Sequence, residues 1–226
     1  MVGIASVGDT TVVSNKWMLG TRNSFIIGIS ATFLATALGT VAALGLSRPS
    51  MPFKGTIMAI LISPMIVPLI ITSAGMFFFY SKIGLTHTYI GLILAHTALG
   101  TPFVVITVTA TLTGFDTNLI RASQSLGADT MRTFFKVIMP LILPGVISGA
   151  LFAFITSFDE VVVVMFVGSV EQITIPKQMW AGLRQETSPV ILCMATCLVF
   201  LSIALLTTVE LLRRRSERLR GIKLRN

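Results

Sequence analysis

The chain has 226 residues, of which 54% are hydrophobic and only 12% are charged. Soluble domains carry about 25% charged residues, and the apolar residues here form long runs, so the composition argues against a soluble domain and indicates a membrane-embedded chain. The net charge of +8 does not indicate nucleic-acid binding, because seven of the seventeen basic residues lie between Arg213 and Asn226, directly after an apolar run. We interpret this tail as a cytosolic anchor that faces anionic lipid.

Five apolar segments predict membrane spans, since each has about 20 residues or more, enough to cross a hydrocarbon core of about 30 Å. They are Ser24–Leu46, Ile57–Tyr80, Thr88–Leu112, Pro140–Val167 and Val190–Leu212. The predicted fold class is therefore all-α, a polytopic bundle of transmembrane helices. We expect an extracytoplasmic N-terminal segment (1–23), a transmembrane domain (24–212) with a cytosolic loop (113–139), and a basic cytosolic tail (213–226).

Two of these segments carry features beyond hydrophobicity. The first has small residues four positions apart, at Ala31, Ala35, Gly39 and Ala43. Such a stripe predicts close approach of two helix backbones in lipid. The second has Pro64 and Pro68, which predict a kinked or broken helix. Backbone carbonyls that lose their helical partner within a membrane must face protein or a wet cavity, so the prolines fit a helix beside a pathway. An ordinary packing irregularity explains the prolines equally well.

The placement of Lys and Arg predicts the orientation of the chain. Twelve of the seventeen basic residues fall in one set of connecting segments and five in the other. The richer set comprises Arg48, Lys54, Arg121, Arg132, Lys136 and the basic residues of the tail. We therefore expect the N-terminus outside, the C-terminus in the cytosol, and the segment that begins at Arg121 on the cytosolic side.

The stretch from Arg121 to Gly149 is a polar, helix-prone segment that ends in two prolines, Pro140 and Pro144. It is longer than a link between two spans requires, so we predict that it docks onto a cytosolic partner. A helix that lies on the lipid surface is the alternative.

The spacing of this segment resembles the EAA loop of ABC importer permeases, in which E-A-A is followed by three residues, Gly, nine residues and I-x-L-P. The matching positions are Ala122, Gly127, Val137 and Pro140, and the departures are Arg121 for Glu, Ser123 for Ala and Met139 for Leu. Because Arg121 reverses the charge at the start of the docking helix, a salt bridge from that position does not carry over.

Within this loop we expect two short helices that hinge near Gly127, because glycine adopts backbone dihedral angles that other residues avoid. The small side chains of Ala122 and Ala128 allow the groove of a partner protein to close on this loop. Phe134 and Phe135 either fill that groove or pack under the loop.

Three further segments look like the spermidine/putrescine-type permeases of this superfamily. They are N-S-F…S-A-T…A-T-A-L-G-T-V-A-A-L at Asn23–Leu44, F-I-T-S-F-D-E-V-V-V at Phe154–Val163 and T-I-P-K-Q-M-W-A-G-L-R at Thr174–Arg184. Permeases of this branch usually have six spans, and the family's first span is the one not visible here. Either the chain starts late or the subunit works without that span; we favour the late start.

The resemblance implies a type I ABC importer permease in a bacterial inner membrane, carrying polyamines or related small amines. It also implies a second permease subunit, identical or not, two ATPase subunits that bind ATP and Mg²⁺, and an extracytoplasmic binding protein. The chain has no G-x-x-x-x-G-K-[ST] phosphate loop, so we expect no ATPase activity, cofactor or metal site in it. The alternatives are an importer for an opine or amino-acid derivative, and a stand-alone secondary transporter, against which the loop spacing argues.

Two carboxylates, Asp159 and Glu160, are candidates for the substrate pathway, together with Phe158 and Tyr80. A charge deep in a span costs about 2.5–3.5 kcal/mol on insertion scales and so usually faces a wet interior or a partner. A carboxylate suits a polycation, and an aromatic ring suits an amine through cation–π contact. The alternatives are a structural carboxylate pair near the outer surface, and core packing for Tyr80.

On the outer side, Lys177, Trp180 and Arg184 are candidate contacts for the binding protein. Trp180 fits an interfacial membrane anchor equally well. His96, inside the third segment, is expected to make a polar contact between helices rather than to carry proton chemistry.

Overall fold

The computed structural model describes residues 7–219 except 49, 115, 117 and 186–188, and every regular element in this part of the chain is helical. The helices are α1 (Val7–Leu46), α2 (Lys54–Ile66), α3 (Leu69–Lys82), α4 (Tyr89–Thr113), α5 (Asn118–Ser125), α6 (Thr130–Thr133), the π-helical turn η1 (Phe134–Ile138), α7 (Met139–Phe158), α8 (Val162–Val167), α9 (Ile175–Gln185) and α10 (Pro189–Leu219).

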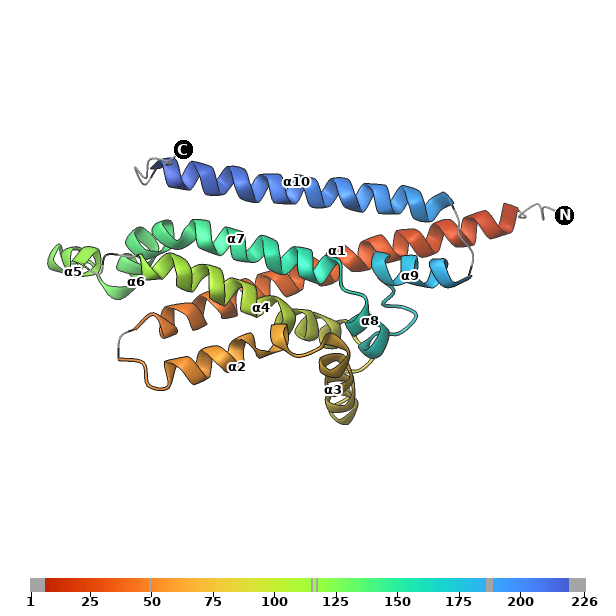
Figure 1. The fold of residues 1–226 in the computed structure, drawn as a ribbon, viewed down its shortest axis with the longest axis horizontal. Coiled ribbons are helices and arrows are strands. Elements are labelled where there is room, and N and C mark those ends of the chain that lie inside the picture. Colours follow the sequence, from red (N-terminus) through yellow and green to blue (C-terminus); the bar gives the residue numbers. More distant parts are fainter. Residues whose placement is uncertain (1–6, 49, 115, 117, 186–188, 220–226) are drawn as a thin grey trace.

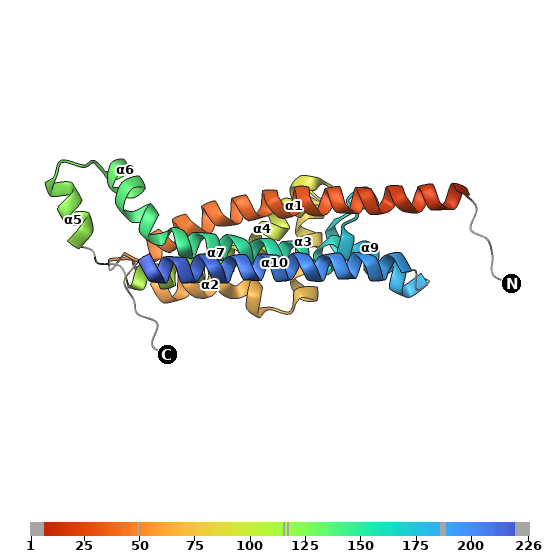
Figure 2. The same cartoon turned by 90° about the horizontal axis from the view of Figure 1, so that it is seen from above.

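Three long helices, α1, α4 and α7, form the centre of the molecule and pack most extensively on one another (Figure 1). Helix α10 lies along α7, and α2 lies against α4. The short helices α5 and α6 project from one end of this bundle, whereas α8 and α9 lie toward the other end (Figures 1 and 2).

Small residues let the three central helices approach closely. Ala31 and Ala35 of the predicted stripe are at most 1% exposed, and Gly39 and Ala43 are also buried. A Cβ atom placed on Gly39 would lie 2.6 Å from the Cβ of Val104 on α4, closer than real side chains come. The close approach that the stripe predicts is therefore confirmed.

The second apolar segment is not one continuous helix, because α2 and α3 meet at a bend of 102°. Val67 precedes Pro68 and is extended, with φ −70° and ψ 136°, because the proline ring disfavours a helical conformation in the residue before it. Pro68 also lacks an N–H that could continue the hydrogen-bond ladder. The break predicted from the two prolines is confirmed.

The spans of the structure differ in extent from those of the sequence prediction. Three helical stretches are long and apolar enough to cross a membrane, Asn15–Leu46, Tyr89–Thr113 and Thr130–Phe158, and α2 with α3 makes a fourth if that bent pair is one span. Within α10 the described apolar stretch, Ile191–Ala204, is shorter. The expected count of five spans is not confirmed and stays a prediction.

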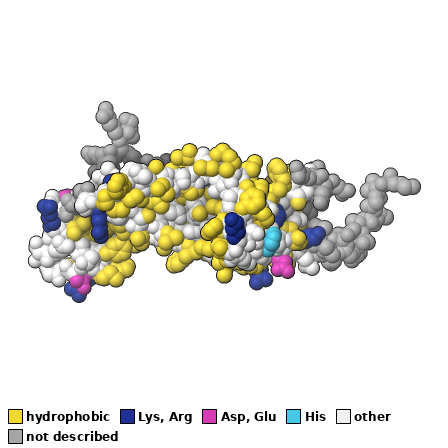
Figure 3. Space-filling model, turned by 90° about the horizontal axis from the view of Figure 1, so that it is seen from below, with side chains coloured by type: hydrophobic (Ala, Val, Ile, Leu, Met, Phe, Trp, Pro, Cys, Tyr) yellow, Lys and Arg dark blue, Asp and Glu magenta, His cyan; other side chains and the backbone are white. Residues whose placement is uncertain are grey.

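Two boundaries of the sequence prediction also shift. Helix α1 begins at Val7, inside the part predicted to precede the first span. The first helix of the predicted fourth segment, α7, ends at Phe158, because Asp159 has non-helical dihedral angles, with φ −91° and ψ 1°. Between the ends of the molecule, hydrophobic side chains dominate the face drawn in Figure 3, as expected of a surface that meets lipid.

A matched pair of glycines on α1 tests the close packing. We expect Gly39→Ala to lower the free energy of unfolding by about 1–2 kcal/mol. Overpacking the helix contact costs about 1–3 kcal/mol, whereas the higher helix propensity of alanine stabilises α1 by up to about 1 kcal/mol. Nothing lies within 4 Å of a Cβ on Gly45, so Gly45→Ala is the control and should be neutral or slightly stabilising. Thermal unfolding of the purified protein in detergent measures both, and equal shifts for the two variants would contradict the packing account.

Candidate functional site

The segment that resembles the EAA loop stands clear of the bundle. Figure 2 shows α5 and α6 projecting beyond the ends of the long helices. Helix α6 continues without a break through η1 into α7, so Thr130–Phe158 forms one helical stretch of 29 residues. A displacement of the projecting segment would therefore be carried directly along α7.

Gly127 forms the turn between α5 and α6. Its φ is +81°, in the left-handed region that glycine adopts without steric cost. The N–H of Ala128 donates to the carbonyl of Ser123 at 3.1 Å, and the N–H of Gly127 donates to that of Gln124 at 2.9 Å. This pair of hydrogen bonds is the Schellman motif, which ends a helix at a glycine. The two short helices expected to meet near Gly127 are confirmed; hinge motion there stays a prediction.

Side chains hold the two short helices at a fixed angle. The carboxylate of Asp129 accepts a hydrogen bond from the N–H of Arg132 at 2.7 Å and so caps α6. The hydroxyls of Ser123 on α5 and Thr133 on α6 lie 2.9 Å apart, and Thr133 is only 3% exposed. Ser123 Oγ also donates to the carbonyl of Ile120, which leaves Thr133 to donate to Ser123. Ser123, noted in the sequence only as a departure from alanine, thus joins α5 to α6.

The outer surface of this loop carries exposed apolar side chains among polar ones. Leu126 is 89% exposed, and Met131 and Phe135 are also exposed, while Phe134 is half-buried and packs edge-to-face on Phe135. Sequence reasoning missed Leu126 and Met131, although an apolar residue directly before a helix-ending glycine is a signal that could have marked Leu126.

The remaining predicted loop residues lie elsewhere along this segment. Arg121, Ala122 and Pro140 are exposed, and Ala128 is half-buried. The structure thus places the predicted loop residues from Arg121 to Ala128 on or just after α5, Phe134 and Phe135 in η1, and Pro140 at the start of α7; the docking role itself stays a prediction.

The two candidate carboxylates lie at the break between α7 and α8 and point to different surroundings. Glu160 is 7% exposed, and its Oε1 accepts a hydrogen bond from the N–H of Val163 at 3.0 Å, in the first turn of α8. Asp159 is exposed at the end of α7. Glu160 therefore supports the start of α8, and Asp159 is the carboxylate free to meet another molecule.

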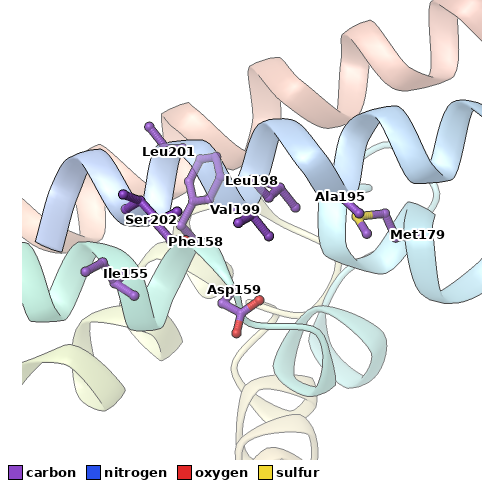
Figure 4. A pocket seen from close by; sticks show the side chains of 10 residues that line it. Ile155, Phe158, Asp159, Met179, Ala195, Leu198, Val199, Leu201 and Ser202 are labelled. Atoms are coloured by element: carbon purple, nitrogen blue, oxygen red, sulfur yellow. The ribbon is translucent and has the colours of Figure 1, made fainter.

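A cavity of about 380 Å³ lies beside Asp159, between α7, α9 and α10. Figure 4 shows Phe158 and Asp159 at the end of α7, Met179 on α9, and residues of α10 around the same space. Among the described residues that line it, Asp159 alone is charged, and most of the others are apolar. A carboxylate beside an apolar wall suits an ammonium group attached to a hydrocarbon chain.

The other two pathway candidates have packing partners. The ring of Phe158 is 8% exposed and lies 5.2 Å from the rings of Phe25 and Phe154, measured between centroids. Tyr80 is 9% exposed and belongs to a core cluster with residues of α1, α4 and α8. Only Phe158 and Asp159 of the four candidates border the cavity.

The candidate binding-protein contacts lie on α9. The ammonium of Lys177 points into the protein and donates to the carbonyls of Val164 at 3.1 Å and Ser169 at 3.3 Å. Burial lowers the pKa of Lys177 below its ordinary value. Trp180 is 47% exposed, whereas the side chain of Arg184 lies outside the described residues.

His96 makes the helix contact expected of it. Its Nδ1 lies 2.7 Å from the Oγ of Ser157, so the pair joins α4 to α7. His96 is 1% exposed and Ser157 6%, so the pair is buried between the helices, and the expected polar contact is confirmed.

Comparison with known proteins decides the family. The family model described as "Binding-protein-dependent transport system inner membrane component" matches residues 18–219. The chain belongs to this family. Among curated members of the transport class, the spermidine/putrescine transport system permease protein PotC of Haemophilus influenzae is 31% identical over 195 residues, covering 86% of this chain and 76% of the relative. The resemblance to permeases of ABC importers is confirmed.

Two further relatives support the same subgroup. PotC of Escherichia coli (strain K12) is 31% identical over 185 residues, with 82% of this chain and 70% of the relative covered. The putrescine transport system permease protein PotI of the same organism is 28% identical over 186 residues, with 78% and 65% covered. These relatives are permease subunits of transport systems, so this family member is an inner-membrane permease of the PotC/PotI type.

Solved structures show the fold of this family member. A chain of the MetNI methionine ABC transporter in an inward-facing conformation matches with a TM-score of 0.65 at 21% identity, covering 94% of this chain and 98% of that one. A chain of an amino acid ABC transporter matches with a TM-score of 0.67 at 14% identity, covering 94% and 100%. The all-helical fold of an ABC transporter membrane subunit is thereby confirmed.

The hydroxyl pair in the projecting loop yields a local prediction. We expect Ser123→Ala to speed amide hydrogen exchange in α5, because the link to Thr133 is lost and a hydrogen bond of this kind contributes about 0.5–1.5 kcal/mol. Ser125→Ala is the matched control, since the Ser125 hydroxyl donates to the carbonyl of Arg121 within α5 itself. Hydrogen exchange measured by mass spectrometry on both variants checks this, and equal exchange in α5 would contradict the link.

Proposed function

We propose that this permease forms the translocation pathway of an ATP-driven importer for polyamines or related small amines. The PotC and PotI relatives support this solute class, since their names specify spermidine and putrescine. The observation that carries the proposal is the location of Asp159, a carboxylate exposed beside a largely apolar cavity at the end of α7. An opine or amino-acid derivative is the alternative solute, and the uptake experiment below separates the two.

The projecting loop is the proposed contact for a separate ATPase. Its exposed apolar side chains, with Leu126 89% exposed, are ones that a soluble partner would cover. One continuous helical stretch joins the loop to the Asp159 break, so closure of an ATPase pair would displace both ends of the same helix. ATP and Mg²⁺ would be bound by that partner.

The rest of the assembly follows from the family and from the ends of the bundle. We propose that the α5–α6 end faces the cytosol, as the Lys and Arg distribution predicts, and that α8 and α9 face the outside. Two ATPase subunits, a second permease subunit and an extracytoplasmic binding protein complete the importer. The binding protein would dock near α9, where Trp180 and Leu183 are exposed.

Replacement of the hinge glycine tests the coupling. We expect Gly127→Asp to leave the subunit in the membrane but to lower transport-coupled ATPase by about tenfold or more, because a side chain at a left-handed φ costs about 1–2 kcal/mol and shifts the loop out of its docking conformation. ATPase activity of the complete importer in proteoliposomes, with and without loaded binding protein, is the measurement.

Two control variants make this test specific. Gly114→Asp adds the same charge at a neighbouring glycine whose φ is −90° and whose surroundings are open, so it should retain coupling. Gly127→Asn should retain more activity than Gly127→Asp, because both side chains visit the left-handed region but asparagine adds no charge to the loop surface. Full coupled ATPase in Gly127→Asp would rule out this loop as the coupling element.

Neutralising the exposed carboxylate tests the solute class. We expect Asp159→Asn to raise the putrescine or spermidine concentration for half-maximal uptake by about tenfold, the equivalent of ~1.4 kcal/mol of binding, because an ammonium in the cavity loses its partner. Uptake of radiolabelled amine into proteoliposomes is the measurement. Uptake of a zwitterionic amino acid by the wild type, with none of either amine, would favour the alternative solute.

A further inference from the structure

A buried polar cluster lies at the end of the bundle opposite the projecting loop. Its members are Asn23, Ser24, Gln172 and Thr174, each no more than 3% exposed. Asn23 and Ser24 belong to α1, whereas Gln172 and Thr174 belong to the segment between α8 and α9. We call this contact between α1 and residues 169–175 the outer junction.

Asn23 uses its whole amide group in the outer junction. Its Nδ2 donates to the carbonyls of Glu171 at 2.8 Å and Ile173 at 2.9 Å. Its Oδ1 accepts from the hydroxyl of Tyr89, the first residue of α4, at 2.9 Å. Two donors and one acceptor therefore tie α1, α4 and the α8–α9 segment together at one side chain, which is completely buried.

Ser24 adds a second link to the same segment. Its Oγ accepts a hydrogen bond from the N–H of Ile175 at 2.9 Å, so a side chain of α1 satisfies the first N–H of α9. Within the segment, Gln172 Oε1 accepts from both the N–H and the hydroxyl of Ser169 and so fixes the preceding turn. The start of α9 is thus set by α1.

Polar bonds rather than extensive packing hold α9 in place. Beyond α1, helix α9 makes only slight contact with α8 and α10. The outer surface of α9 exposes Trp180 and Leu183, at 47% and 60%. A ligand on that surface would therefore act on α1 through the outer junction, while the hydrogen bonds of Lys177 tie α9 to the end of α8.

Helix α1 is suited to carry such a force onward. It packs along both α4 and α7, and its buried small residues leave little room for the helices to slide independently. Helix α7 in turn runs without a break to the projecting loop. A continuous set of packed elements thus joins the start of α9 to the opposite end of the molecule.

We propose that Asn23 is a positioning residue that transmits binding-protein docking on α9 to the bundle, and through it to the ATPase. This inference rests on the proposed function. Asn23 touches neither solute nor nucleotide; it fixes the angle between α9 and α1, so that a docked protein moves both as one body. Loss of the junction leaves the docking surface present but separates it from α1.

The experiment compares ATPase activity of the complete importer in proteoliposomes, without binding protein and with saturating spermidine-loaded binding protein. The variants are Asn23→Ala, Asn23→Asp, Tyr89→Phe and Ser24→Ala. Thr21→Val is the control, because the Thr21 hydroxyl donates to the carbonyl of Trp17 within α1 itself. Asn23→Asp keeps the shape of the side chain but turns an oxygen toward two carbonyls.

We expect basal ATPase to be unchanged and the stimulated-to-basal ratio to fall by about fivefold in both Asn23 variants, the lower end of ordinary allosteric coupling. Tyr89→Phe and Ser24→Ala should lose less, because each leaves both Asn23 Nδ2 hydrogen bonds in place, and Thr21→Val should match the wild type. If Asn23→Asp fails to assemble, Tyr89→Phe and Ser24→Ala decide the matter by the same ratio.

Three results would overturn the inference. An unchanged ratio in assembled Asn23 variants means that the junction carries no signal. A parallel fall of basal and stimulated ATPase means that Asn23 is structural only. A wild-type importer that the binding protein does not stimulate contradicts the proposed function itself, and is thereby distinguished from the other two.

Discussion

Backbone-to-backbone packing of α1, α4 and α7 is the constraint on which the rest of the structure depends. Lipid tails are as apolar as leucine side chains, so helices in a membrane gain little from hiding hydrophobic surface and associate through close contact instead. Small residues at the contacts make that possible, as at Gly100, where a Cβ would lie 3.0 Å from the Cβ of Ala153 and 3.4 Å from that of Ala35. The His96–Ser157 hydrogen bond adds a directional contact to this packing.

Breaks in helical geometry place the candidate functional groups at the edges of this packed centre. The left-handed Gly127 turns the chain at the tip of the projecting loop. The non-helical Asp159 ends α7 and presents a carboxylate to the cavity beside α10. Because Thr130–Phe158 is one helical stretch, these two breaks lie at the two ends of a single rigid element. The arrangement suits a permease, which must relate events on opposite sides of a membrane.

Local sequence signals predicted the features that depend on local chemistry. The glycine position of the EAA-like loop indicated the turn at Gly127, and Pro64 with Pro68 indicated the break between α2 and α3. Both predictions hold because glycine and proline change the backbone conformation within a few residues. The four-residue spacing from Ala31 to Ala43 indicated the packed face of α1, since a helix repeats its faces at that interval. The sequence motifs also indicated the family, which the match over residues 18–219 confirms.

Contacts between distant residues were beyond the reach of those signals. Asn23 bonds to carbonyls 148 and 150 residues away, and no local pattern specifies which backbone groups a buried amide will meet. The same holds for Glu160, for which the sequence left both a pathway role and a structural role open; the structure shows its carboxylate accepting from the N–H of Val163 at the start of α8. The sequence by itself determined a helical membrane permease, its turn at Gly127 and its small-residue face. Only the tertiary structure decided which carboxylate borders a cavity, which way Lys177 points and how α9 is attached, because burial and hydrogen-bond partners depend on how the helices are arranged in space.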